Sequence, residues 1–264
     1  MNSYFTMKKE ILEKIREKRE FSQLPEIDIK LAYENFAKRQ CSEEEKIKLT
    51  KELLRENFSA FVSKKLLSLK NKEPEWILRK HISTRERLFH YKEIYERIFS
   101  GLNKASVIDL GSGINGFSYN FLKKYNVNYV AVESVGQLVD LMNFYFEKEK
   151  LKASAINESL FNEKKILGII KKQEKPRVVF LFKVIDALEK IKHDYSKKLI
   201  LDIAPLADKF VLSFATKSLG NRRTFHAKRN WIFDFIKENF KILDDFKIGG
   251  ERYLIFRTVS KKFK

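Results

Sequence analysis

Short β-rich runs alternate with helical patterns after residue 104, and this alternation restricts the fold more than any other feature. The runs are "SVIDLG", "NYVAVE", "ASAINES", "RVVFLFK" and "FVLSFA". About 15 to 25 residues separate them, enough for crossover helices, which predicts parallel pairing. The closing "FKILDDFKIGGERYLIFRTV" holds two further runs joined at Gly249-Gly250, a hairpin signal. We therefore expect an α/β fold with five parallel strands and a C-terminal antiparallel hairpin.

Residues 1–80 lack glycine and show amphipathic patterns, which predicts a helical N-terminal region. "MKKEILEKIREKRE" places Ile11 and Ile15 on one apolar face, and Ser42 with Glu45 fits a capping box. We expect residues 1–80 to be a helical region and residues 81–264 to form the α/β domain. At the start of the latter, "HISTRERLFHYKEIYERIF" (81–99) is polar in its first half and amphipathic in its second.

The charge balance indicates a polyanionic partner. Lys and Arg number 54 against 35 Asp and Glu, a formal net charge of +19, and the pI is about 9.7. Nucleic acid is the commonest partner of such a chain, although lysine-rich composition also arises in AT-rich genomes. Cys41 is the only cysteine, which excludes a disulfide framework or a cysteine-rich zinc site and favours the cytoplasm. We expect no metal, and without a signal peptide or a long apolar run we expect no membrane attachment.

A glycine-rich segment, "VIDLGSGING", follows the first predicted strand. Gly111, Gly113 and Gly116 have G-x-G-x-x-G spacing and precede a predicted helix. Glu133 ends the second strand about 20 residues later, where a carboxylate can accept hydrogen bonds from ribose hydroxyls. This pattern fits NAD as readily as S-adenosylmethionine, and a tight turn without a ligand is the structural alternative.

Two features favour S-adenosylmethionine. Asp109 precedes Gly111 in the D-x-G-x-G form typical of class I methyltransferases, and the terminal hairpin resembles the antiparallel last strand that those enzymes add to a Rossmann-like sheet. That resemblance implies the strand order 3-2-1-4-5-7-6. The chain also ends too early for the second substrate domain of a dehydrogenase.

The kind of methyl transfer is narrowed by what is missing. Carbon-5 methylation of pyrimidines needs a cysteine nucleophile, and Cys41 lies far from any strand end. Exocyclic amine methylation usually shows an N/D-P-P-Y/F motif after the fourth strand, but this strand ends "FLFKVIDAL". Two kinds of methyl acceptor remain. One is guanine N7, whose lone pair needs no general base, and the other is a hydroxyl assisted by Lys183.

The motifs "HISTRERL", "VIDLGSG", "VVFLFKVIDALE", "VLSFATKSLG" and "FKILDDFKIGGERYLIF" together resemble the aminoglycoside-resistance 16S ribosomal RNA methyltransferases, from about residue 50 to the C-terminus. The resemblance implies methylation of guanine N7 in the decoding region, with the helical region extending the RNA-binding surface. It implies that Arg85 holds the methionine carboxylate of the donor and that Ser83 and Thr84 cap a helix. His81 is a pocket residue or a buried structural histidine, whereas Glu86 and Arg87 are structural or solvated.

The whole predicted cofactor site consists of His81, Arg85, Asp109, Gly111, Ser112, Gly113, Asn115, Glu133, Ser134, Glu158 and Phe182. Departures from the family are Gly116, where a proline is usual, and Glu133, where an aspartate is usual; they leave the target nucleotide open.

On the substrate side, Lys183 ends the fourth strand near the expected methyl group, either as a catalytic contact or as a solvated strand-end lysine. A basic loop follows the fifth strand and predicts phosphate contacts, with a solvated loop as the alternative. Its cations are Lys217, Arg222, Arg223, Lys228 and Arg229. We expect a monomer that acts on ribosomal RNA or on the assembled small subunit; a 2′-O-methyltransferase using Lys183 and a non-catalytic RNA-binding protein are the alternatives.

Overall fold

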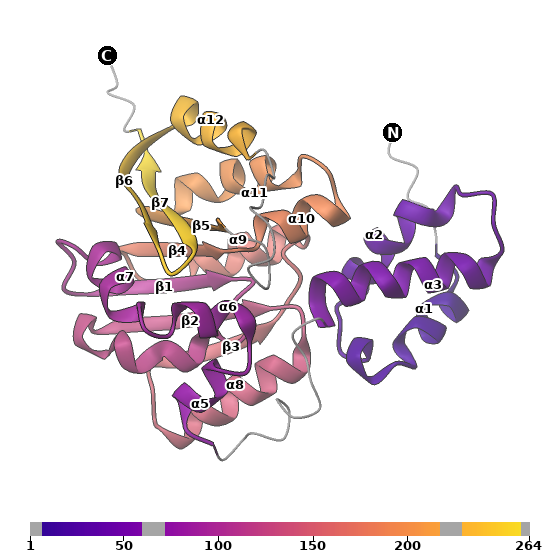
Figure 1. The fold of residues 1–264 in the computed structure, drawn as a ribbon, viewed down its shortest axis with the longest axis horizontal. Helices are drawn as coiled ribbons and strands as arrows, with labels where there is room; N and C mark the ends of the chain where they lie inside the picture. The colour runs from indigo at the N-terminus through magenta and orange to yellow at the C-terminus, as the bar shows by residue number, and fades with distance from the viewer. Residues whose placement is uncertain (1–6, 60–71, 217–228, 260–264) are drawn as a thin grey trace.

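The computed structural model describes residues 7–59, 72–216 and 229–259, and its centre is a seven-stranded sheet of order β3-β2-β1-β4-β5-β7-β6 (Figure 1). The first five strands pair in parallel, and β7 runs antiparallel between β5 and β6. Both the predicted hairpin and the strand order implied by the resemblance are therefore confirmed. The strands are β1 (Ala105–Leu110), β2 (Val127–Glu133), β3 (Ala153–Asn157), β4 (Arg177–Phe182), β5 (Lys209–Ala215), β6 (Phe240–Ile248) and β7 (Glu251–Thr258).

Helices cover both faces of the sheet, and each face has its own apolar core. The side chains of β1 point alternately into the two cores: Val107 belongs to one core and Ile108 to the other. Around the first core lie α5 (Pro74–Leu78), α6 (Ile82–Arg87), α7 (Tyr91–Ile98), α8 (Gly136–Lys148) and the 3₁₀ turns η3 (Asn115–Phe121) and η4 (Lys123–Tyr125). Around the second lie α9 (Glu163–Lys171), α10 (Ile185–Ile191), α11 (Tyr195–Ile203), η5 (Ala204–Leu206) and α12 (Asn230–Asn239).

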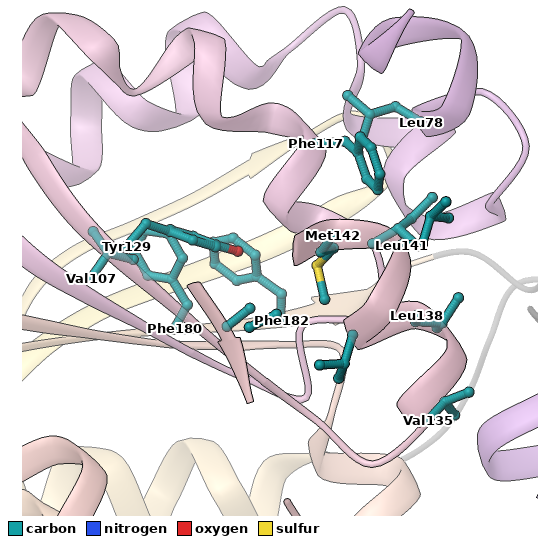
Figure 2. Packing of buried hydrophobic residues seen from close by; sticks show 14 of the residues in the cluster. Leu78, Val107, Phe117, Tyr129, Val135, Leu138, Leu141, Met142, Phe180 and Phe182 are labelled. Atoms are coloured by element: carbon teal, nitrogen blue, oxygen red, sulfur yellow. The ribbon is translucent and has the colours of Figure 1, made fainter. Parts of the chain in front are cut away.

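The first core is rich in aromatic side chains (Figure 2). Phe180 stacks on Phe182 with ring centroids 4.6 Å apart. Figure 2 also shows Leu78 of α5 close to Phe117 of η3, in line with the packing of these two elements against each other. The predicted apolar face of residues 88–99 is buried in this core, which confirms that part of the sequence analysis.

Three helices at the N-terminal end form a separate group beside the α/β unit, with α2 facing α10 (Figure 1). This helical unit consists of α1 (Lys9–Arg16), η1 (Arg19–Phe21), α2 (Glu26–Ala37), α3 (Glu43–Leu54) and the π-helical turn η2 (Arg55–Ser59). The Ser42 hydroxyl accepts the Glu45 amide at 3.2 Å, as the capping box predicts. Asn35 Nδ2 donates to the Ile191 carbonyl of α10 at 3.0 Å, so polar contacts join the two units.

The segment after the glycine loop departs from the prediction. Instead of an α-helix, the 3₁₀ turns η3 and η4 follow. Asn115 at the start of η3 is buried, and its side chain is hydrogen-bonded to residues of β1 and α7. These bonds hold the start of η3 close to β1 and α7. In the part of the chain that the structure describes, no helix has the length and apolarity to cross a membrane.

Candidate active site

A cavity of about 350 Å³ opens at the carboxyl ends of the parallel strands. Its wall includes Gly111 after β1, Glu133 at the end of β2 and Lys183 after β4. Ligand sites of open α/β sheets lie at this edge, and small-molecule sites commonly measure about 300–1,000 Å³. The position and size of the cavity are therefore those of a nucleotide-sized ligand site.

The glycine loop forms part of the cavity wall. Gly111 has a φ of +71°, and a Cβ added there would lie 2.5 Å from Cγ2 of Val184. Both the left-handed backbone and the close approach therefore require glycine at this position. Gly113 also has a positive φ, +55°, and its Cβ position faces Nε2 of His81 at 3.6 Å.

Glu133 joins the ends of β1 and β2. Its Oε2 accepts the Gly113 amide at 2.8 Å and its Oε1 accepts the Val135 amide at 2.9 Å. Burial raises the pKa of Glu133, and these two amide bonds oppose the shift. Since the Gly113 amide already donates to a carboxylate, it is not available to a pyrophosphate group, which disfavours NAD as the ligand.

The motif at residues 81–87 forms α6, but not with the predicted caps. His81 precedes the helix, while Ser83 and Thr84 lie inside it. The Thr84 hydroxyl donates to the carbonyls of Leu78 and His81, at 2.6 and 3.1 Å, so it connects α6 to the end of α5. The capping prediction was therefore wrong, because the Thr84 hydroxyl donates to backbone carbonyls that precede it and accepts no amide at the start of α6.

His81 lines the cavity and is 7% exposed. Burial lowers the pKa of His81 to about 3, and the charges of Arg87 and Lys183 act in the same direction. The imidazole is thus neutral over the physiological range and suits hydrogen bonding to a ligand rather than charge pairing.

A buried ion-pair network supports the wall beside β4. Arg87 Nε lies 3.0 Å from Glu251 Oε2, and the two side chains are 4% and 0% exposed. Lys183 Nζ lies 2.6 Å from Glu86 Oε2 and 3.4 Å from Glu251 Oε2. Although burial alone would raise it, the charges of Arg87 and Lys183 hold the pKa of Glu251 below its ordinary value. Lys183 also has a φ of +56°, a strained conformation that is often found at functional sites.

Two predicted cofactor residues belong to a buried polar cluster instead. Asp109 Oδ2 accepts from Asn115 Nδ2 at 2.7 Å and from the Tyr129 hydroxyl at 2.6 Å. Asn115 Oδ1 in turn accepts from Tyr91 and Arg87, at 2.7 and 3.2 Å. Neither Asp109 nor Asn115 lines the cavity, because both side chains are buried in this polar cluster. They hold β1, η3 and α7 together, and their predicted contact with the cofactor stays a prediction.

Two further predicted cofactor residues also lie outside the cavity wall. Arg85 is exposed on the outer face of α6, because helical geometry turns it away from the buried positions Thr84 and Arg87. Glu158 Oε1 is occupied by the Ser159 amide at 2.9 Å and by Asn162 Nδ2 at 3.2 Å. The cavity does collect seven of the predicted cofactor residues and Lys183; the seven are His81, Gly111, Ser112, Gly113, Glu133, Ser134 and Phe182.

Of the predicted basic loop, Lys217, Arg222, Arg223 and Lys228 lie outside the described residues. Arg229 lines the cavity, where its guanidinium donates to Asp186 and to the Ala215 carbonyl. Its side chain is only 10% exposed, so it holds α10 and the end of β5 together at the rim.

Sequence reasoning missed the contribution of the helical unit to the cavity. Asp28 of α2 lines it together with Glu56, Asn57 and Phe58 of η2. Asp28 is 1% exposed, and its Oδ1 accepts the Ser159 hydroxyl at 2.7 Å. The sequence holds no signal for this contact, because Asp28 and Ser159 are 131 residues apart.

An antiparallel β7 between β5 and β6, with a glycine loop after β1 and an acidic residue ending β2, defines the fold of class I methyltransferases. The model of the ribosomal RNA methyltransferase family (FmrO) matches residues 51–238, more than half of the chain. The chain belongs to this family, as the motifs predicted.

Individual relatives agree with this assignment. A 16S rRNA (guanine(1405)-N(7))-methyltransferase of Proteus mirabilis is 25% identical over 191 residues, which are 68% of this chain and 63% of the relative. The match thus spans less than two thirds of the relative's length. The solved structures of the 16S rRNA methylase RmtB and of the 16S rRNA methyltransferase RmtF with S-adenosyl-L-homocysteine share the fold.

The RmtB structure has a TM-score of 0.77 at 17% identity, over 97% of this chain and all of that chain. The RmtF structure has a TM-score of 0.78 at 19% identity, over 96% of this chain and all of that chain. The 16S rRNA methylase ArmA is 26% identical with a TM-score of 0.58, over 74% of this chain and 97% of that chain.

Proposed function

We propose that this protein transfers a methyl group from S-adenosylmethionine to guanine N7 in the decoding region of small-subunit ribosomal RNA. The match to the ribosomal RNA methyltransferase family carries the proposal, since it spans β1 to β5 and therefore every strand end that lines the cavity. The Proteus mirabilis relative supports N7 of guanine as the atom.

The cavity fits the donor. Glu133 ends β2, where its carboxylate can also accept hydrogen bonds from the ribose hydroxyls. His81, Ser112 and the amides of the glycine loop line the part of the cavity nearest β1 and suit the methionine moiety. When bound, the donor supplies an electrophilic methyl group on a sulfonium. The carboxylate of Glu133 in the cavity wall complements a cationic ligand.

On the substrate side, the protein's main task is positioning. Guanine N7 has a free lone pair at neutral pH, so its methylation needs no general base, only alignment with the methyl group. Lys183 Nζ already donates to Glu86, so we assign it to positioning the base or a phosphate. A 2′-O-methyltransferase would need a group free to take a proton from a hydroxyl, which makes that alternative the weaker one.

Radiolabelled donor, with naked 16S rRNA and assembled small subunits as parallel substrates, tests the proposal. We expect label in the RNA of at least one substrate, and cleavage by borohydride and aniline at the labelled nucleotide, as for N7-methylguanine. Glu133→Ala should abolish transfer and donor binding, whereas Glu93→Ala, an exposed carboxylate on α7, should leave both unchanged.

Donor binding without RNA labelling would support a non-catalytic RNA-binding protein. Label on a ribose hydroxyl would support the 2′-O alternative.

A further inference from the structure

Asp28 is a buried carboxyl group that the mechanism above does not use. It lies on α2 of the helical unit, is 1% exposed, and faces the cavity of the α/β unit. Its Oδ1 is held by the Ser159 hydroxyl at 2.7 Å. Its Oδ2 is buried and makes no hydrogen bond of normal geometry with any described residue, although the Ser134 hydroxyl also lies near the carboxyl group. A buried carboxylate oxygen without a partner is costly, which points to a ligand as the missing donor.

The position of Asp28 along the sheet edge indicates which part of the donor it meets. Ser159 follows β3, Glu133 ends β2 and Lys183 follows β4, and the sheet order is β3-β2-β1-β4. With the ribose at Glu133 and the methyl group on the side of Lys183, the base of the donor extends the other way, toward the end of β3. Leu160 and Phe161 line the cavity there and provide the apolar surface that an adenine ring needs.

We propose that Asp28 accepts a hydrogen bond from the exocyclic amine of the donor's adenine and so makes the helical unit part of the nucleoside-specificity site. This inference rests on the proposed use of S-adenosylmethionine. Glu158, which follows β3 directly, does not line the cavity, and its Oε1 accepts from Ser159 and Asn162. Asp28 therefore supplies the acceptor at this end of the cavity. An amine donates to the carboxylate, whereas a carbonyl oxygen at the same position would be repelled by it.

Calorimetry with S-adenosylhomocysteine and S-inosylhomocysteine tests this, since the second ligand carries a carbonyl in place of the amine. The wild-type protein should prefer the adenosyl compound by about tenfold or more, because a site built for a donor rejects an acceptor. Asp28→Asn should reduce this preference at least severalfold, since an amide can donate to the inosyl carbonyl. Asp140→Asn is the matched control, because Asp140 contacts Gln23 of the helical unit but lies outside the cavity wall. It should keep the wild-type preference.

An unchanged preference in folded Asp28→Asn, or an equal loss of affinity for both ligands, overturns the inference and leaves Asp28 a structural residue. If the variant does not fold, Ser159→Ala replaces it: the carboxyl stays but loses its orienting hydroxyl, so the preference should narrow by a smaller factor. If the wild-type protein binds neither ligand, the proposed function itself fails.

Discussion

Arg87 carries a full positive charge into the interior between β4, β7 and η3. Its guanidinium pairs with Glu251, donates to Asn115, and lies 4.9 Å from the ring centroid of Phe182. The charge of Glu251 raises the pKa of Arg87 well above its ordinary value, against the effect of burial. Because both partners are desolvated, removing one leaves a buried charge without compensation.

Arg87→Met should therefore lower the free energy of unfolding by about 3–5 kcal/mol. Arg97→Met is the matched control: Arg97 pairs with Asp244 at 2.9 Å, but the side chains are 41% and 31% exposed. Exposed pairs contribute about 0.2–1 kcal/mol. Urea unfolding of both variants measures the difference, and equal losses would show that the Arg87 pair is not buried in solution.

Asp28 gives a pH dependence of stability with a definite sign. Burial raises the pKa of Asp28 from 3.8 to about 7; the Ser159 and Ser134 hydroxyls oppose the shift, and the charges of Glu133 and Glu158 add to it. Between these two values the folded state holds the proton and the unfolded state has lost it. The contribution of Asp28 to stability is thus largest at low pH, decreases as pH rises from about 4 to 7, and is constant above that.

Asp28→Asn removes this titration. The free energy of unfolding of the variant minus that of the wild type should therefore rise between pH 4 and pH 7, by at most about 1.4 kcal/mol per pH unit. Denaturant unfolding at several pH values, without ligand, measures it. A difference that is flat across this range would mean that Asp28 titrates normally.

At the scale of elements, η3 and α8 are packed through a glycine. A Cβ at Gly116 would lie 2.6 Å from Cζ of Phe146 and 2.9 Å from Sδ of Met142, both on α8. The third glycine of the loop therefore permits close helix packing, whereas the first permits the sharp turn over the cavity. This packing sets the distance between the glycine loop and α8.

Gly116→Ala should consequently destabilise the protein by about 1–3 kcal/mol through overpacking. Gly168→Ala in α9 is the control, since nothing lies within 4 Å of its Cβ position. There the alanine should stabilise by about 0.5–1 kcal/mol, because it has less backbone freedom to lose. Thermal unfolding of the two variants and the wild type measures these differences in stability. A Gly116→Ala variant as stable as the wild type would show that α8 can shift without a cost in stability.

At the scale of the whole molecule, the helical unit and the α/β unit share one cavity. Asp28 and η2 line it from one side and the strand ends from the other. Gln137 of α8 donates to the Arg19 carbonyl at 2.8 Å, and Lys190 lies 3.2 Å from Glu56. A ligand in this cavity contacts both units, so its binding free energy stabilises their association.

Binding of S-adenosylhomocysteine should therefore slow amide hydrogen exchange in α2 as well as in the glycine loop. Residues 240–248 of β6, at the opposite edge of the sheet, serve as an internal reference and should not change. Exchange followed by mass spectrometry resolves these segments. Protection confined to the α/β unit would contradict a shared site.

The sequence by itself determined the strands, the hairpin at Gly249-Gly250, the glycine loop and Glu133. These features depend on local periodicity, on turn chemistry and on the common edge at which parallel strands end. For this reason the sequence could place Gly111 and Lys183 at the strand-end edge where the cavity opens.

Only the tertiary structure decided which polar side chains reach the cavity. Arg87 and Glu251 pair across 164 residues, and Asp28 meets Ser159 across 131. The Arg85 side chain lies outside the cavity and the Asn115 side chain points into the core. The position of each residue on its helix, and not the motif it belongs to, decides where its side chain points. Contacts between residues so far apart depend on how the helical unit packs against the sheet, and no local pattern encodes that packing.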